Sequence, residues 1–111
     1  MQQWAALCCV VTILWVAGLD DARHSAAVAT TYTVDIDGVT FAPATLTVAV
    51  GDTVVWINRD PFPHTVTSQT GGFDSHPIAS GQSWGYKTTK AGVFPYLCTL
   101  HPTMHATLTV E

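Results

Sequence analysis

The chain has 111 residues, and its eight acidic and four basic side chains give a net charge of −4 at pH 7. This length suits one domain rather than two, and a mild negative charge without a basic cluster excludes nucleic acid as a partner. Apolar residues make up 48% of the chain and charged residues only 11%, and much of the apolar excess lies ahead of residue 30.

The first element in chain order is an apolar N-terminal segment. Residues 4–19 carry no charge, and residues 7–16 are almost wholly hydrophobic. This run is shorter than the roughly 20 residues that span a bilayer, and Ala27-Val28-Ala29 beyond it fits the small-x-small rule of signal peptidase. We therefore expect residues 1–29 to be a secretory signal peptide and residues 30–111 to be an exported, periplasmic domain without a membrane span.

Two features of this segment leave alternatives open. The first three residues carry no Lys or Arg, so only the terminal amine supplies positive charge. Residues 16–18, Val-Ala-Gly, form a second candidate cleavage site. An uncleaved N-terminal anchor is therefore the structural alternative to a cleaved signal.

The rest of the chain has the pattern of short strands separated by turns. Segments that alternate apolar and polar residues, or are apolar on both faces, cover residues 32–36, 45–50, 53–58, 64–67, 83–88, 93–98 and 106–110. No segment has a convincing period of 3.6 residues. The sequence therefore predicts an all-β fold, a Greek-key β-sandwich of about seven to eight strands. Such a fold also serves plain binding and adhesion, so a metal-free interaction domain is an alternative.

Cys98 is the only cysteine beyond residue 29, so it has no partner for a disulfide within the expected domain. A lone thiol in an oxidising compartment is buried and inert, joined to another chain, reactive, or bound to a metal. The loop that begins at Cys98 favours the last of these, because His101 and Met104 follow at intervals of three residues.

A thiolate, an imidazole and a thioether in one short loop can converge on one point, and this donor set favours copper. Blue-copper sites place two His and one Cys in a trigonal plane, with a weak axial Met. The second His has to come from elsewhere, and His64 is the best candidate because it follows a proline-stiffened loop and begins an extended segment. The sequence predicts one copper ion bound by His64, Cys98, His101 and Met104.

Other chemistries fit this donor set less well. Structural zinc sites use more Cys or His and rarely Met, iron–sulfur clusters need about four thiolates, and the Cys-x-x-Cys-His motif of covalent haem is absent. A Cys98–His101 nucleophile is conceivable, but no motif marks an oxyanion hole or a substrate pocket. We therefore expect a protein that is not an enzyme. Delivery or storage of copper is the alternative to electron transfer.

The motifs around these donors resemble those of plastocyanin-type cupredoxins. The first half of that family's pattern is matched at residues 41–43, 46–48, 51–58 and 63–66, and its ligand loop at residues 92–104. The short Cys-x₂-His-Pro-x-Met loop and the Pro-His pair at the first ligand are most similar to the amicyanin subgroup. The resemblance covers nearly the whole expected domain.

The resemblance implies a monomeric carrier of one electron that cycles between Cu(I) and Cu(II). It makes His64, Cys98 and His101 the equatorial ligands and Met104 the axial ligand. An amine dehydrogenase and a c-type cytochrome are the redox partners it suggests. It also implies that the His101 ring reaches an apolar patch where electrons leave. The residues expected to form the wall of that patch are Pro61, Phe62, Leu100, Pro102 and Thr103.

Three positions distinguish this chain within that resemblance. Leu97 stands where amicyanins often carry a His, Thr65 stands where they often carry Asn, and His105 directly follows Met104. The backbone N–H of Thr65 is expected to donate to the Cys98 sulfur and so to tune the potential. His105 is expected to be exposed, with ligation or titration near the site as the lesser hypothesis.

Overall fold

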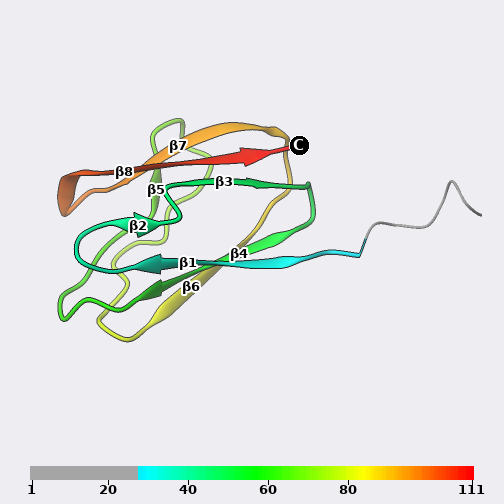
Figure 1. The fold of residues 1–111 in the computed structure, drawn as a ribbon. Helices are drawn as coiled ribbons and strands as arrows, with labels where there is room; N and C mark the ends of the chain where they lie inside the picture. The colour runs from blue at the N-terminus through cyan, green and yellow to red at the C-terminus, as the bar shows by residue number, and fades with distance from the viewer. Residues whose placement is uncertain (1–27) are drawn as a thin grey trace, which may run out of the picture.

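The computed structural model describes residues 28–111, and every regular element there is a strand. Two four-stranded sheets face each other across the core (Figure 1). The first sheet has the order β2-β1-β4-β6, formed by β1 Thr31–Ile36, β2 Phe41–Ala42, β4 Thr53–Asn58 and β6 Ser83–Lys87. The second has the order β3-β8-β7-β5, formed by β3 Thr45–Val48, β5 Thr67–Ser68, β7 Gly92–Cys98 and β8 His101–Val110. The predicted all-β sandwich is confirmed.

The N-terminal segment lies almost entirely outside this description. Residues 1–27 are not part of it, so the signal peptide expected over residues 1–29 stays a prediction. Within residues 28–111 there is no helix with the length and apolar character needed to span a membrane.

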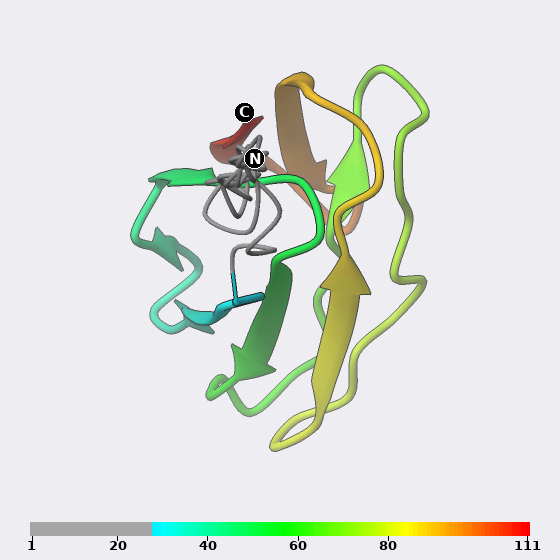
Figure 2. The same cartoon turned by 90° about the vertical axis from the view of Figure 1, so that its right-hand side faces the viewer.

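Strand β4 is one of the two inner strands of the first sheet, as its apolar residues on both faces predict. It runs parallel to β1, with Thr53 opposite Thr31, and antiparallel to β6, with Trp56 opposite Trp84. Figure 2 shows β4 beside β6, and β5 beside β7. The alternation of the β4 side chains therefore aims every second residue into the core.

The core is held across the two sheets by a pair of large aromatic side chains. Trp56 of β4 is fully buried, and its Nε1–H donates to the hydroxyl of Tyr96 of β7 at 3.2 Å. Their rings also meet edge to face, with centroids 5.6 Å apart. This satisfies the polar atom of each ring inside an apolar core. Burial raises the pKa of Tyr96 to about 12, although the hydrogen bond from Trp56 opposes the rise.

The structure differs from the sequence prediction around the two segments that carry the candidate ligands. The loop expected over residues 99–104 is shorter, because β8 already begins at His101 and pairs with Cys98 after a register shift between Leu97 and Cys98. The strand expected over residues 64–67 is only β5. His64 instead makes an isolated bridge with Ile78.

One end of the sandwich brings these segments together. Strands β1, β4 and β7 end there, and β8 begins there, at the left of Figure 1. The loops that join them carry His64, the turn 37–40 and the turn between Cys98 and His101. The fold therefore places the candidate ligands on the tips of a rigid scaffold.

Candidate metal centre

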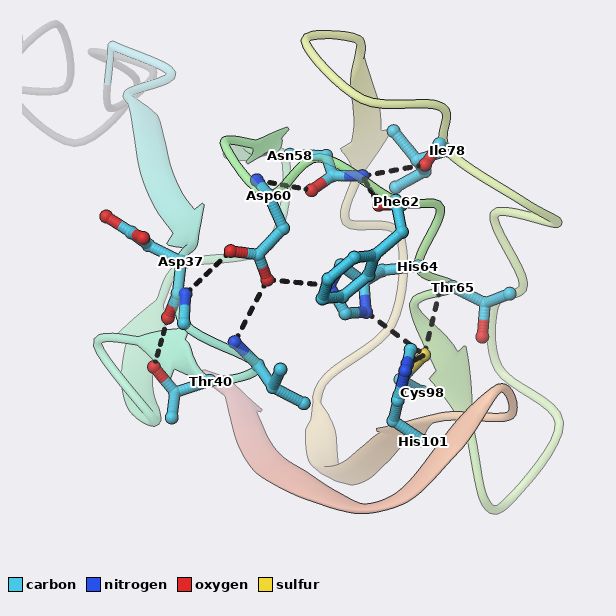
Figure 3. A network of polar contacts seen from close by, with 12 residues as sticks. Asp37, Thr40, Asn58, Asp60, Phe62, His64, Thr65, Ile78, Cys98 and His101 are labelled. Carbon is cyan, nitrogen blue, oxygen red and sulfur yellow. Dashed lines mark hydrogen bonds and ion pairs between the residues drawn. The ribbon is translucent and has the colours of Figure 1, made fainter.

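Three of the four predicted donors converge at this end of the sandwich. The ligand atoms of His64, Cys98 and His101 all lie within 4.8 Å of one another. The Cys98 sulfur is 3.6 Å from Nδ1 of His64 and 3.8 Å from Nδ1 of His101. Each imidazole therefore points its Nδ1 atom towards the thiol (Figure 3).

These spacings suit a shared metal ion. For a first-row metal with nitrogen and sulfur bonds of about 2.0 and 2.3 Å, trigonal or tetrahedral angles separate the donors by about 3.6–3.8 Å. The two sulfur–nitrogen distances, 3.6 and 3.8 Å, match this separation. A thiolate with two imidazoles, and a thioether close by in sequence, is a donor set that favours copper over the harder metals.

Cys98 and His101 owe their positions to the β7–β8 connection. Phe94, Tyr96 and Cys98 share the inward face of β7, and Cys98 is fully buried. A turn of two residues separates it from His101 at the start of β8. The register shift at Cys98 re-aims the side chains at the ladder's end, as bulges do.

His64 is held by its backbone and by a buried amide. Its N–H donates to the carbonyl of Ile78 at 3.1 Å, and its own carbonyl accepts from the Ile78 N–H at 2.7 Å. The side chain of Asn58, fully buried at the end of β4, donates to the carbonyls of Phe62 and Ile78 and accepts from the N–H of Asp60. The loop that carries His64 is thus fixed at both ends.

The remote nitrogen of His64 also has a partner, which the sequence analysis missed. Nε2 of His64 lies 2.7 Å from Oδ2 of Asp60, and both side chains are buried. Burial opposes charge on Asp60, but hydrogen bonds from the N–H groups of Val39 and Gly38 and from His64 outweigh it, so the pKa of Asp60 lies below its usual value. The signal was an acidic residue four positions before a candidate ligand.

The Thr65 backbone N–H donates to the Cys98 sulfur at 3.3 Å, as predicted. The residue pattern does not indicate the second contact, in which the Thr65 hydroxyl accepts from the N–H of Thr99 at 2.8 Å. The hydroxyl of Thr67 donates to the same oxygen at 3.1 Å. Thr65 therefore ties the His64 segment to the turn that follows Cys98.

Met104 and His105 point to opposite sides of β8. Met104 is buried in the same core cluster as Cys98, which places it on the inward face three residues beyond His101. Its role as axial ligand stays a prediction. His105 is exposed, as expected.

The outer rim of the centre is apolar. Phe62 and Leu100 are 39% and 49% exposed, and the ring of Phe62 lies 5.5 Å from that of the half-buried His101. The remaining residues of the predicted patch, all exposed, are Pro61, Pro102 and Thr103. His64, by contrast, has no exposed surface.

Comparison with known proteins decides the family. The model of the cupredoxin-like domain matches residues 6–110. The chain belongs to the cupredoxin family. The predicted membership of the cupredoxins is thereby confirmed. In a cupredoxin, two imidazoles and a thiolate at this end of the sandwich are the site of one type 1 copper ion, and copper is the cofactor of this domain.

Relatives of this cupredoxin include amicyanins and plastocyanins. It is 36% identical over 83 residues to amicyanin of Paracoccus denitrificans, covering 70% of this chain and 63% of that protein. It is 28% identical over 90 residues to plastocyanin of Scenedesmus fuscus, covering 69% and 92%. A solved Cu(I) structure of an amicyanin mutant superposes with a TM-score of 0.67 at 34% identity, covering 81% of this chain and 89% of that one. The match thus spans 63% of the length of the Paracoccus amicyanin.

Proposed function

We propose that this cupredoxin is an exported, monomeric electron carrier whose single copper ion is held by His64, Cys98, His101 and Met104. The observation that carries the proposal is the convergence of two imidazole nitrogens and one thiol within 4.8 Å. When bound, copper supplies a one-electron couple between Cu(I) and Cu(II). The protein accordingly acts by carrying electrons and not as an enzyme.

The surroundings of the donors support a carrier because they resist movement. Each equatorial donor lies on a strand end or in a loop fixed by buried hydrogen bonds, such as those of Asn58 and Thr65. A site whose ligands keep their places in both oxidation states spends little energy on reorganisation when an electron arrives or leaves. The Thr65 N–H adds a hydrogen bond that withdraws charge from the Cys98 sulfur and helps to set the potential.

The apolar rim over His101 supports an exit route for electrons. His101 is the only equatorial donor with exposed surface, since His64 and Cys98 are fully buried. Phe62 and Leu100 beside it form a surface on which another protein can dock closely. Likeness to amicyanin suggests an amine dehydrogenase as electron donor and a c-type cytochrome as acceptor.

Export is the remaining part of the proposal. Residues 1–29 have the apolar run and the small-x-small site of a signal peptide. Delivery to the periplasm would place the single thiol of the domain in an oxidising compartment, where copper and complete burial both protect it.

The first test is the spectrum of residues 30–111, which contain every described strand, with one equivalent of Cu(II). We expect an intense thiolate-to-copper band in the visible range and a small copper hyperfine splitting. Both signals should disappear in Cys98→Ser and His101→Gln. His105→Gln, which changes an exposed His of the same strand, is the matched control and should leave both unchanged. A colourless wild-type protein would refute the four-ligand assignment.

A second test separates a carrier from a delivery or storage protein. A carrier keeps its copper through repeated one-electron reduction and oxidation, whereas a delivery protein releases it in one state.

Leu100→Lys should slow electron exchange between protein molecules by placing a charge on the rim. Val93→Lys, at the exposed far end of β7, is the control and should have little effect.

A further inference from the structure

Among the described residues 28–111, His64 is the only side chain that can place a positive charge against the buried carboxylate of Asp60. It is 5% exposed, and three nitrogen atoms lie within hydrogen-bonding distance of its oxygens. Oδ1 accepts from the N–H of Gly38 at 2.7 Å, while Oδ2 accepts from the N–H of Val39 at 2.9 Å and lies 2.7 Å from Nε2 of His64. Charge-assisted bonds of this number offset the cost of removing a carboxylate from water.

The two backbone donors come from one tight turn. Asp37 and Thr40 exchange N–H···O bonds of 3.1 and 3.2 Å, and Gly38 and Val39 between them both have positive φ, 60° and 58°. Successive residues of this kind form a two-residue hairpin turn. The turn aims its two central N–H groups at Asp60, as Figure 3 shows beside the labelled ends of the turn.

The conformation of Val39 indicates that the surrounding structure holds this turn in place. A β-branched residue in the left-handed region is strained by about 1–2 kcal/mol. Such a conformation persists where the surroundings determine it, and the bond from its N–H to Asp60 is one such restraint. The Asp60 carboxylate and the turn therefore hold each other in position through protein contacts alone, without a metal.

The contact with His64 has a chemical consequence for the ring. An ionised carboxylate only accepts hydrogen bonds, so Nε2 of His64 has to carry the ring proton. In a neutral imidazole this leaves Nδ1 with a free lone pair. Nδ1 is the atom that faces the Cys98 sulfur.

We propose that Asp60, anchored by the turn at Gly38 and Val39, is a positioning residue that holds His64 as the Nε2–H tautomer and strengthens it as a donor to Cu(II). The proposal rests on the assignment of His64 as a ligand. A buried anion behind the imidazole stabilises the more positive oxidation state of the metal more than the less positive one. Asp60 thus favours Cu(II) over Cu(I) and lowers the reduction potential.

The chain provides a matched control at the other end of β4. Asp52 is also buried, at 6% exposure, and its carboxylate accepts from the N–H groups of Thr30 and Ala49 at 2.8 and 2.9 Å. Within the part of the chain that the structure describes, its hydrogen-bond partners include no imidazole. Asp52→Asn therefore removes a comparable structural carboxylate without touching the ring.

The first experiment needs no variant. Nitrogen-15 NMR of the copper-free wild-type protein, labelled at histidine, distinguishes the protonated from the unprotonated ring nitrogen. We expect His64 to show a protonated Nε2 with slow solvent exchange and an unprotonated Nδ1. A proton on Nδ1 of His64 would overturn the proposal, and this result does not depend on copper or on the folding of a mutant.

The second experiment compares Asp60→Asn with Asp52→Asn in copper titrations. The amide offers one acceptor to three donors, so the ring loses its fixed partner. Loss of such an outer partner weakens metal binding by about 10–100-fold, and we expect this for Cu(II) in Asp60→Asn, with a smaller loss for Cu(I). Each tenfold difference between the two raises the potential by about 59 mV.

The control decides what the change means. Asp52→Asn should lower stability yet keep Cu(II) affinity within about twofold of wild type, well under the change expected for loss of an outer partner. Equal effects of the two substitutions on Cu(II) affinity and potential would reduce Asp60 to a structural role and overturn the proposal. A wild-type protein without the blue band would instead refute the proposed function, so the two failures are distinguishable.

Discussion

A buried carboxylate that accepts backbone N–H groups lies at each end of β4, and the two carboxylates have different roles. Asp52 lies just before the strand and Asp60 just after it, and both are buried carboxylates that accept two backbone N–H groups. At the Asp52 end the hydrogen bonds only hold neighbouring loops together. The Thr88 hydroxyl contributes to them through the carbonyls of Ala49 and Asp52. At the Asp60 end a third donor is the ring of His64. A structural motif becomes part of a metal centre by gaining one partner.

The substitution with the largest expected effect, Trp56→Ala, tests whether both ends of β4 depend on one core. Trp56 lies between them on β4, and Trp56→Ala removes a fully buried indole and its bond to Tyr96. We expect a loss of about 3–5 kcal/mol in the free energy of unfolding. Urea unfolding of the copper-free protein, followed by tryptophan fluorescence and by amide signals at both ends, should show one shared transition. Separate transitions for the two ends would break the comparison.

Asn58→Ala should damage the metal end. The fully buried amide makes three hydrogen bonds, and its removal leaves the carbonyls of Phe62 and Ile78 and the N–H of Asp60 without that partner. We expect about 2–3 kcal/mol of destabilisation, together with weaker Cu(II) binding because the loop of His64 loosens. Chemical denaturation and a copper titration measure the two effects. Unchanged copper affinity would show that the loop does not need this anchor.

Thr88→Val is the counterpart at the other end. The buried Thr88 hydroxyl contacts the carbonyls of Ala49 and Asp52 and the N–H of Gly51. We expect a loss of about 1–2 kcal/mol in stability with an unchanged blue spectrum and Cu(II) affinity. A spectral change here would mean that the two ends communicate through the sandwich, contrary to the comparison.

Alkaline pH reports on the core region between the two ends. Burial raises the pKa of Tyr96 from 10.0 to about 12, so the folded state keeps its proton where the unfolded chain loses it. Stability from this residue is complete below pH 10 and is lost between pH 10 and about 12, with a slope of up to about 1.4 kcal/mol per pH unit. Tyr96→Phe should flatten that slope in urea titrations run across this range. An equal slope in the variant would assign the titration to another group.

Local spacing explains why so much of the centre could be predicted. Cys98, His101 and Met104 lie within seven residues, so their pattern is visible in the sequence, and the alternation in β4 and β7 predicts which side chains face inward. His64 was found because blue copper requires a second imidazole.

The supporting shell could not be predicted, because its partners are distant in sequence. The N–H groups that anchor Asp60 come from a turn 21 and 22 residues earlier. The hydroxyl of Thr65 meets Thr99 across 34 residues. Backbone donors leave no trace in residue type, so only the fold reveals them. The early start of β8 was missed for a related reason, since a register shift has no pattern of its own.

The place of β8 in the second sheet has a consequence for the order of assembly during synthesis. β8 lies between β3 and β7, and β3 finds its ladder partner only there, with Thr45 opposite Thr107. The ribosome therefore releases β3 long before its neighbour exists, and pairings so distant in sequence form slowly. Three of the four proposed ligands also lie in β7 and β8, the last two strands of the sandwich in chain order. The copper centre can be completed only after residues 98–104 have been made, so metal acquisition follows the synthesis of most of the sandwich.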